Sequence, residues 1–294
     1  FFQLFYKTFN MHCPVITKRI KNKRDISLFA DDGGDVVFGD TAEECQARIQ
    51  EAADKKADWF DCAGLTLNID KSEVIGFGFS PSPISINGEI ISPSTSIKFL
   101  GLRIQSNLKW DQHLTDLCNK VRWSAGRIRS EGSLLGEKDK RILYNGWILG
   151  LIHTNALAFL PTLTEGQLSS LQTAMNAGIR ATLNLPRKSV ISMTTMREKH
   201  GFLSVWDIRD KCIMMAAYRK RDDFFNKSES PNRPNTRAKT NGNIPHPLIK
   251  GQLGKMTSAV TASMWNRIPK EIRDEPNFNK ASRSIKRLFK KPLS

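Results

Sequence analysis

The periodicity of apolar residues changes near Trp110, and this change most limits the folds available to the chain. Before Trp110, short apolar runs flank turn-forming residues, a pattern typical of strands and hairpins. After it, apolar residues such as Leu114, Leu117 and Val121 recur every three or four positions, which predicts amphipathic helices. The sequence therefore predicts an α+β protein whose strands precede most of its helices.

Hairpins and strands are expected in the first part of the chain. Residues 25–40, DISLFADDGGDVVFGD, predict a hairpin because two apolar runs flank the turn-forming cluster DDGG. Residues 84–91 predict a second hairpin, with Asn87-Gly88 at its turn. Residues 1–24 are expected to be little more than the lead-in to the first hairpin. The other expected strands are 65–70, which would pair with 74–79, and a single strand at 96–104.

Helix-start signals support the predicted helices. Thr41 with Glu44, and Thr164 with Gln167, have the spacing of a capping box, in which two side chains satisfy free N–H groups at the helix start. The first box predicts a helix over 41–63. The other segments with helical periodicity are 111–131, 137–160, 164–185, 201–221 and a short basic stretch near residue 285.

The positive charge of the chain lies almost entirely in its second part. The 294 residues include 45 Lys and Arg against 29 Asp and Glu, a formal net charge of +16. Residues 1–110 have a net charge of −1 and residues 111–294 a net charge of +17. This asymmetry favours a polyanionic partner, nucleic acid above all, over the alternative of a merely solvated surface. No apolar run is long enough for a membrane span, so no membrane partner is expected.

Asp31 and Asp32 are the first candidates for chemistry. Two adjacent carboxylates repel each other unless a cation holds them, and Mg²⁺ prefers such hard oxygen ligands. The same DDGG stretch is also ordinary turn composition, so a purely structural turn is the alternative. The five cysteines form no CxxC motif and favour neither a disulfide scaffold nor a zinc site.

Four segments, in this order, resemble the reverse transcriptases of non-LTR (LINE-type) retrotransposons, particularly the jockey-like group. Leu28–Asp32 resembles the FADD box of that family, and Gly64–Asn68 with Lys71 resembles the palm segment that follows it. Lys98–Gly101 resembles the primer grip, and Leu108–Leu114 its continuation into the thumb. A fifth segment, residues 265–273, WNRIPKEIR, resembles the end of many such reading frames.

The resemblance implies an RNA-directed DNA polymerase that works by two-metal nucleotidyl transfer. It implies Mg²⁺ as cofactor, an RNA template, a DNA primer and deoxynucleotides as partners, and the nucleus and cytoplasm of a eukaryotic cell as location. Asp31 would be the principal metal ligand and Asp32 an auxiliary one, and Lys71 would be a general acid or an electrostatic partner of the pyrophosphate. The implied primer-grip residues are Phe99, Leu100 and Gly101. Plain alternatives are a solvated lysine for Lys71 and core packing for Phe99 and Leu100.

The resemblance also suggests a division of the chain into four parts. Residues 1–104 would form an incomplete polymerase palm, an antiparallel sheet with one helix, and 105–225 a helical thumb with its extension. Residues 226–247 are expected to be a linker and 248–294 a basic C-terminal segment. In the thumb, Lys120, Arg122, Arg127 and Arg129 would contact nucleic-acid phosphates. Arg122 and Arg129 are seven residues apart and share a helix face, with Trp123 beside them.

The chain departs from the family upstream of the FADD box. A two-metal site needs a further carboxylate from an earlier strand, yet no acidic residue precedes Asp25. The family's PQG segment and fingers region are also absent. We therefore expect the C-terminal portion of a reverse transcriptase, truncated upstream, that does not polymerise alone. The alternative is a non-catalytic RNA- or DNA-binding remnant; the sequence indicates no oligomeric state.

Overall fold

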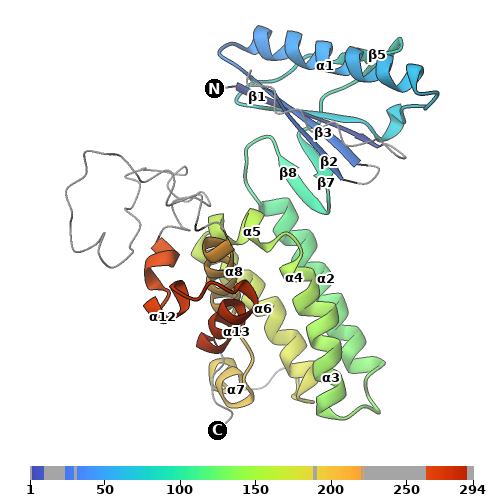
Figure 1. Cartoon of the computed structure of the whole chain (residues 1–294). Coiled ribbons are helices and arrows are strands. Elements are labelled where there is room, and N and C mark those ends of the chain that lie inside the picture. Colours follow the sequence, from blue (N-terminus) through green and yellow to red (C-terminus); the bar gives the residue numbers. More distant parts are fainter. Residues whose placement is uncertain are drawn as a thin grey trace. The chain divides into compact units, whose positions relative to one another are not determined.

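The computed structural model describes residues 2–9, 24–29, 32–187, 191–219, 221 and 263–289. For the strands at 2–9 and 24–29, and for Asp32, it describes the backbone only. The chain divides into two compact units, Phe1–His113 and Leu114–Ser294 (Figure 1). The first unit holds antiparallel sheets and one long helix, and the second is helical, so the described chain has the expected α+β composition. The expected linker, 226–247, lies outside the described residues.

A four-stranded antiparallel sheet forms the base of the first unit. Its strands are β1 (Phe2–Phe9), β2 (Arg24–Phe29), β3 (Asp32–Gly39) and β4 (Glu73–Phe77), in the order β2-β3-β1-β4. β2 and β3 pair with Phe29 opposite Asp32, which confirms the pairing expected of the first hairpin. The turn assigned to DDGG was wrong, because Asp32, Gly33 and Gly34 belong to β3. β3 pairs with β1 on one side and with β2 on the other, and this pairing offsets the conformational entropy that Gly33 and Gly34 lose on folding.

β1 is the main element of this unit that the sequence did not predict. It lies between β3 and β4, with Gln3 opposite Phe38 on one side and Phe77 on the other. The expected strand at 65–70 was wrong, because residues Ile69–Lys71 form a 3₁₀ turn, η1. The Asn68 side chain caps this turn by accepting a hydrogen bond of 3.1 Å from the Lys71 N–H. β4 therefore takes β1 as its partner, instead of the preceding segment.

Two small hairpins follow the sheet. β5 (Ile84–Ile86) and β6 (Glu89–Ile91) pair around Asn87 and Gly88, whose positive φ angles of 51° and 84° suit a tight turn, and this hairpin is confirmed. The single strand expected at 96–104 was wrong. It is a hairpin of β7 (Ser96–Phe99) and β8 (Leu102–Gln105), turning at Leu100 and Gly101 with φ angles of 46° and 83°. A branched residue such as Leu100 rarely signals a left-handed turn, and so the sequence pattern concealed it.

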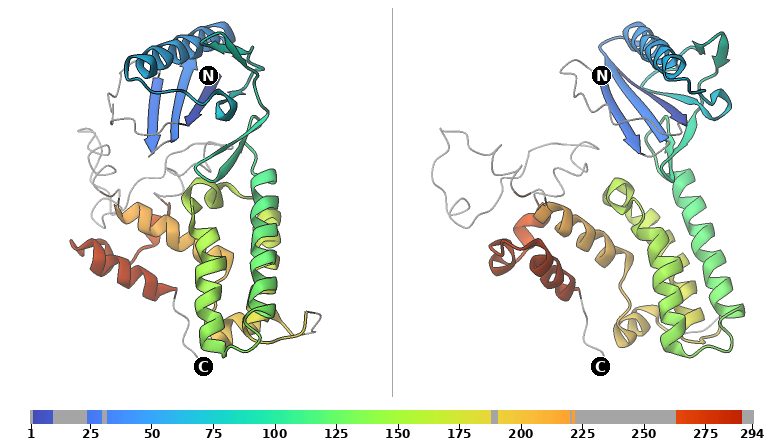
Figure 2. Two further views of the ribbon diagram at one scale, coloured as in Figure 1. Left: turned by 90° about the vertical axis from the view of Figure 1, so that its right-hand side faces the viewer. Right: turned by 45° about the vertical axis from the view of Figure 1, so that its right-hand side comes forward.

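Helix α1 (Ala42–Cys62) covers one face of the sheet (Figure 2). Thr41 caps it as expected, accepting a hydrogen bond of 3.1 Å from the Glu44 N–H. The Glu44 carboxylate completes the cap one residue earlier than a standard box, on the Asp40 N–H at 2.7 Å. The buried stripe of α1 packs on Val37 and Val74 of the sheet, and its members include Ile49, Ala53, Ala57 and Phe60.

The second unit is built from helices on both sides of α6 (Glu165–Thr182). The predicted capping box of α6 is confirmed, since Thr164 and Gln167 bond each other's backbone N–H groups. α2 (Asp111–Ser130) matches the helix expected at 111–131, although its first turn belongs to the first unit. In the region expected to be helical, 137–160, α3 (Glu137–Leu143), the π-helix η2 (Tyr144–Leu149) and α4 (Gly150–His153) follow one another without a break. Asn155, whose φ of 57° is left-handed, separates them from α5 (Ala156–Phe159) and the 3₁₀ turn η3 (Leu160–Thr162).

The C-terminal helices share a core with α8. Helix α7 (Met193–His200) was not predicted, and α8 (Val205–Arg219) lies inside the helix expected at 201–221. Tyr218 of α8 packs with Trp265, and both belong to one buried cluster with Ile285. That cluster joins α8 to the helical residues 263–267, α12 (Lys270–Arg273) and α13 (Phe278–Leu288). The segment WNRIPKEIR is therefore part of the fold of this unit.

Candidate nucleic-acid interface

The expected metal ligands lie where the structure describes little. Asp31 lies outside the described residues, and Asp32 is the first residue of β3, with only its backbone described. In the backbone register Asp32 is opposite Phe9 of β1 and Phe29 of β2. Among the described residues, no three His, Cys, Asp or Glu side chains gather as metal ligands would. The metal site thus stays a prediction.

The other expected polymerase residues lie in or next to turns of the first unit. Lys71 is exposed at the end of the 3₁₀ turn η1. Leu100 and Gly101 form the turn of the β7–β8 hairpin, so this part of the expected primer grip is a tight backbone turn. Phe99 packs against the cluster of Ile75, Phe77 and Ile97, which gives it a structural role in the unit.

Asp35 is a buried carboxylate that the sequence reasoning missed. It is fully buried on β3 and forms an ion pair with Lys56 of α1, whose side chain is 10% exposed. This pair ties the strand that follows the FADD box to the helix that covers it. The available signal was a charged residue inside the otherwise apolar strand DVVFG, and its partner was 21 positions away.

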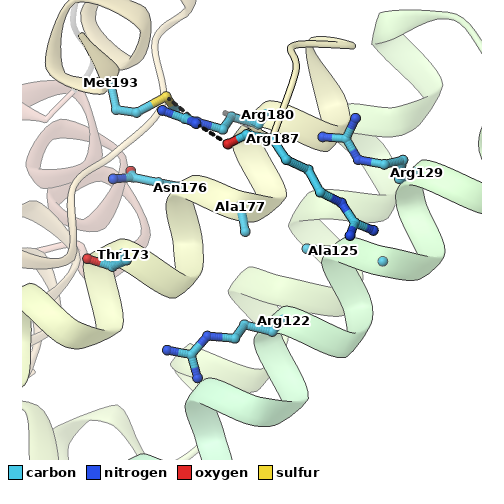
Figure 3. Close-up of a pocket in the computed structure, with 10 residues that line it drawn as sticks. Arg122, Ala125, Arg129, Thr173, Asn176, Ala177, Arg180, Arg187 and Met193 are labelled. Carbon is cyan, nitrogen blue, oxygen red and sulfur yellow. Dashed lines mark hydrogen bonds between the residues drawn. The ribbon is translucent and has the colours of Figure 1, made fainter. Parts of the chain in front are cut away.

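A pocket of about 500 Å³ in the second unit gathers four arginines (Figure 3). Arg122 and Arg129 come from α2, Arg180 comes from α6, and Arg187 follows α6. The rest of the lining is small or uncharged: Ala125, Gly126, Thr173, Asn176, Ala177 and Met193. No acidic residue lines the pocket, so the guanidinium groups give it an unbalanced positive charge.

Neutral partners bond three of these guanidinium groups. Arg122 donates to Asn119 Oδ1 at 3.3 Å. Arg129 donates to the Leu185 carbonyl oxygen at 3.0 Å. Arg180 donates to the Arg187 carbonyl oxygen at 2.6 Å and to Met193 Sδ at 3.1 Å. Within the part of the chain that the structure describes, none of the four arginines forms an ion pair. Their charge is thus available to an anion, and such fixed donors suit the bidentate geometry of a phosphate group.

The basic helix 111–131 divides its arginines between two faces. Arg122 and Arg129 share the pocket, in keeping with their seven-residue spacing. Arg127 is five positions from Arg122, about 140° around the helix, and does not line the pocket. Its Nε and Nη2 donate to the Glu131 carboxylate at 2.7 and 2.8 Å, and these bonds lower the pKa of that carboxyl. Lys120 is exposed and also lies off the pocket.

Two pocket residues, Arg180 and Arg187, were not among the predicted site residues. They follow the end of α2 by 50 and 57 positions and come together with its arginines only in the folded unit. Arg180 stands on the polar side of a strongly periodic helix, where the sequence pattern alone predicts a solvated charge. Their role as pocket residues therefore depends on tertiary packing.

The fold and the pocket define a class of protein: an α+β chain whose helical unit carries a basic, carboxylate-free pocket. Comparisons with known protein families, curated proteins and solved structures found no match for the chain. Over the described residues, none of the helices has the length and apolar character needed to cross a membrane.

Proposed function

We propose that this chain is the C-terminal portion of a non-LTR retrotransposon reverse transcriptase and that its helical unit binds nucleic acid. The order of the FADD, palm, primer-grip and thumb segments supports the family assignment. The observation that carries the binding proposal is the pocket with four arginines and no carboxylate. Such a pocket suits backbone phosphates, which every RNA or DNA sequence presents in the same way.

In this proposal the first unit is an incomplete palm and the second a thumb with its extension. Asp31 and Asp32 would hold Mg²⁺, which when bound activates the primer 3′-hydroxyl and neutralises the triphosphate. Lys71 would face the pyrophosphate, and the turn at Phe99–Gly101 would face the primer. The RNA template, DNA primer and deoxynucleotides would be partners of the longer enzyme, in the nucleus and cytoplasm.

Strand β1, which lies beside β3, gives a reason to expect nucleic-acid binding without polymerisation. A third carboxylate would have to come from a strand next to the FADD hairpin, and β1 occupies that place. Its sequence, FQLFYKTF, has no acidic residue. This observation favours a second candidate function, a non-catalytic nucleic-acid-binding remnant. An in-frame F-x-D strand and PQG segment in the adjoining DNA would favour the enzyme portion, and a stop codon there the remnant.

We expect the isolated chain to extend no primer when it is given primed template RNA, deoxynucleotides and Mg²⁺. The reason is that β1, the strand that pairs with β3 of the FADD hairpin, has no acidic residue in its sequence. The measurement is a gel assay of primer length, with a competent reverse transcriptase as the positive control. Template-dependent extension that Asp31→Asn abolishes would contradict the prediction and would mean that a ligand comes from elsewhere.

Binding through the pocket is expected to be tolerant of sequence and steeply dependent on salt. Each neutralised phosphate contributes roughly −0.7 to −0.9 to the slope of log affinity against log salt concentration. The variant Arg122→Gln/Arg129→Gln/Arg180→Gln should lower affinity similarly for all sequences and flatten the slope by about two to three units. The measurement is a filter-binding titration of RNA and an RNA–DNA hybrid at several salt concentrations.

A matched control removes the same charge elsewhere in the helical unit. Lys138, Lys199 and Lys270 are exposed and lie outside the pocket lining, so their triple replacement by Gln should leave most of the affinity intact. Circular dichroism checks that both variants are folded, because Arg129 and Arg180 also bond the backbone. Equal losses in the two triple variants, or binding that ignores salt, would count against the pocket.

A further inference from the structure

We propose that Trp123 on α2 is a stacking site for an unpaired nucleobase, and that the helical unit therefore prefers single-stranded nucleic acid to duplex. This inference rests on the proposed nucleic-acid binding and identifies the form of nucleic acid that the unit selects. It concerns a face of α2 other than the arginine pocket.

Trp123 is unusually open to solvent for a large aromatic residue in a folded helical unit. It is 65% exposed, whereas Tyr144, Phe159 and Trp265 of the same unit are buried. The guanidinium carbon of Arg127 lies 4.9 Å from the centroid of the Trp123 ring and 4.4 Å from that of Trp147 in η2. An exposed indole beside a cation is the combination that stacks nucleobases without regard to their sequence.

The arrangement around Trp123 is held in place before any ligand binds. The Glu131 carboxylate accepts two hydrogen bonds from Arg127, at 2.7 and 2.8 Å, and fixes the guanidinium against both tryptophans. Arg127 therefore has a structural part in the stacking site, on a face of α2 about 140° from Arg122. A stacking surface that is already ordered loses little conformational freedom when a base binds.

The stacking site and the arginine pocket lie on different faces of the same helix, α2. Trp123 follows Arg122 directly, so the two side chains are about 100° apart around α2. A single strand whose phosphates occupy the pocket would have bases free to turn onto Trp123. In a duplex the bases are paired and stacked inside the helix, so the phosphates can reach the pocket but the bases cannot reach Trp123. The two sites together thus favour a single strand.

The positive charge favours a nucleobase over a protein as the occupant of this site. Trp123 follows Arg122 in the sequence, and Arg122 lines a pocket with four arginines and no carboxylate; nucleic acid supplies both an anion for that pocket and a flat aromatic ligand for the indole. A protein partner or a second copy of the chain is a possible outcome of the test. It would appear as Trp123-dependent association in the absence of nucleic acid.

The test compares the full chain with its Trp123→Ala and Trp123→Phe variants on a 12-nucleotide single-stranded RNA and a duplex of the same sequence. Fluorescence anisotropy of a labelled strand gives the affinities. We expect Trp123→Ala to weaken single-strand binding by roughly 10- to 100-fold, the loss typical of one stacked base, and duplex binding by less than about threefold. Trp123→Phe keeps an aromatic face and should restore most of the loss.

The salt slope separates stacking from phosphate binding. Trp123→Ala should keep the slope of the unmodified chain, because it removes no cation, whereas the triple arginine variant should flatten it. Equal losses on both nucleic acids, no loss, or Trp123-dependent self-association without RNA would overturn the stacking site while leaving the phosphate pocket in place. If the unmodified chain binds neither nucleic acid, the proposed function itself fails.

Discussion

Replacing Asp35 by Ala is expected to lower the free energy of unfolding of the strand-rich unit by about 3–5 kcal/mol. Asp35 is fully buried, and the Lys56 side chain with which it pairs is only 10% exposed. The substitution removes the carboxylate that pairs with the Lys56 ammonium group between α1 and β3. A buried charge that loses its partner costs far more than the same loss at the surface.

The measurement is urea unfolding monitored by hydrogen exchange of amides in α1. Because α1 belongs to the strand-rich unit, this signal reports the free energy of unfolding of that unit. The double variant Asp35→Ala/Lys56→Met should recover a large part of the loss, because it removes both charges together. The surface pair of Lys55 and Glu51, one turn apart on α1, provides the matched control. Glu51→Ala should change the free energy of unfolding by less than about 1 kcal/mol. Similar costs for Asp35→Ala and Glu51→Ala would refute the prediction.

The second large effect is expected where α6 meets the π-helix η2. Gly178→Ala should lower the free energy of unfolding of the helical unit by about 1–3 kcal/mol through overpacking. A Cβ atom at Gly178 would lie 2.3 Å from Ile148 Cδ1 and 3.1 Å from the Tyr144 ring. Both neighbours are fully buried, so neither can move away without disturbing the core.

A second substitution tests whether the contact with Ile148 Cδ1 causes the expected loss of stability in Gly178→Ala. Ile148→Val removes the Cδ1 atom, so the double variant Gly178→Ala/Ile148→Val should be more stable than the sum of the single effects predicts. Gly166 is the matched control on the same helix, because a Cβ there meets no atom within 4 Å. Thermal unfolding of Gly166→Ala should show no loss of stability. The steric explanation fails if the two alanine variants behave alike or if Ile148→Val brings no recovery.

Local chemistry made some elements predictable from the sequence. Asn87-Gly88 adopts the left-handed angles that a two-residue turn requires, and those two residue types adopt them readily. Thr164 and Gln167 satisfy each other's backbone within four residues, so the start of α6 needs no distant partner. Where the deciding contacts lie close in sequence, the pattern of residues was sufficient.

Features that depend on distant contacts were missed. β1 has no regular alternation, and its place in the sheet comes from its pairing with β3 and β4. Asp35 lies in an apolar strand and pairs with Lys56 of α1, which is 21 positions away in the sequence. Arg180 and Arg187 join Arg122 and Arg129 only through helix packing. The seven-residue spacing on α2 therefore predicted that Arg122 and Arg129 share a face, whereas no sequence pattern predicted that Arg180 and Arg187 join them.

The place of β1 in the sheet has a consequence for the order in which the chain can fold. Its Gln3 pairs with Phe38 and Phe77, so this strand is synthesised well before its second partner. During that interval one edge of β1 has no partner, and unpaired edges of apolar strands readily join other chains. The sheet of the first unit can be completed only after β4 has been synthesised as far as Phe77. Slow translation of the residues between β1 and β4 would therefore prolong the time during which β1 can aggregate.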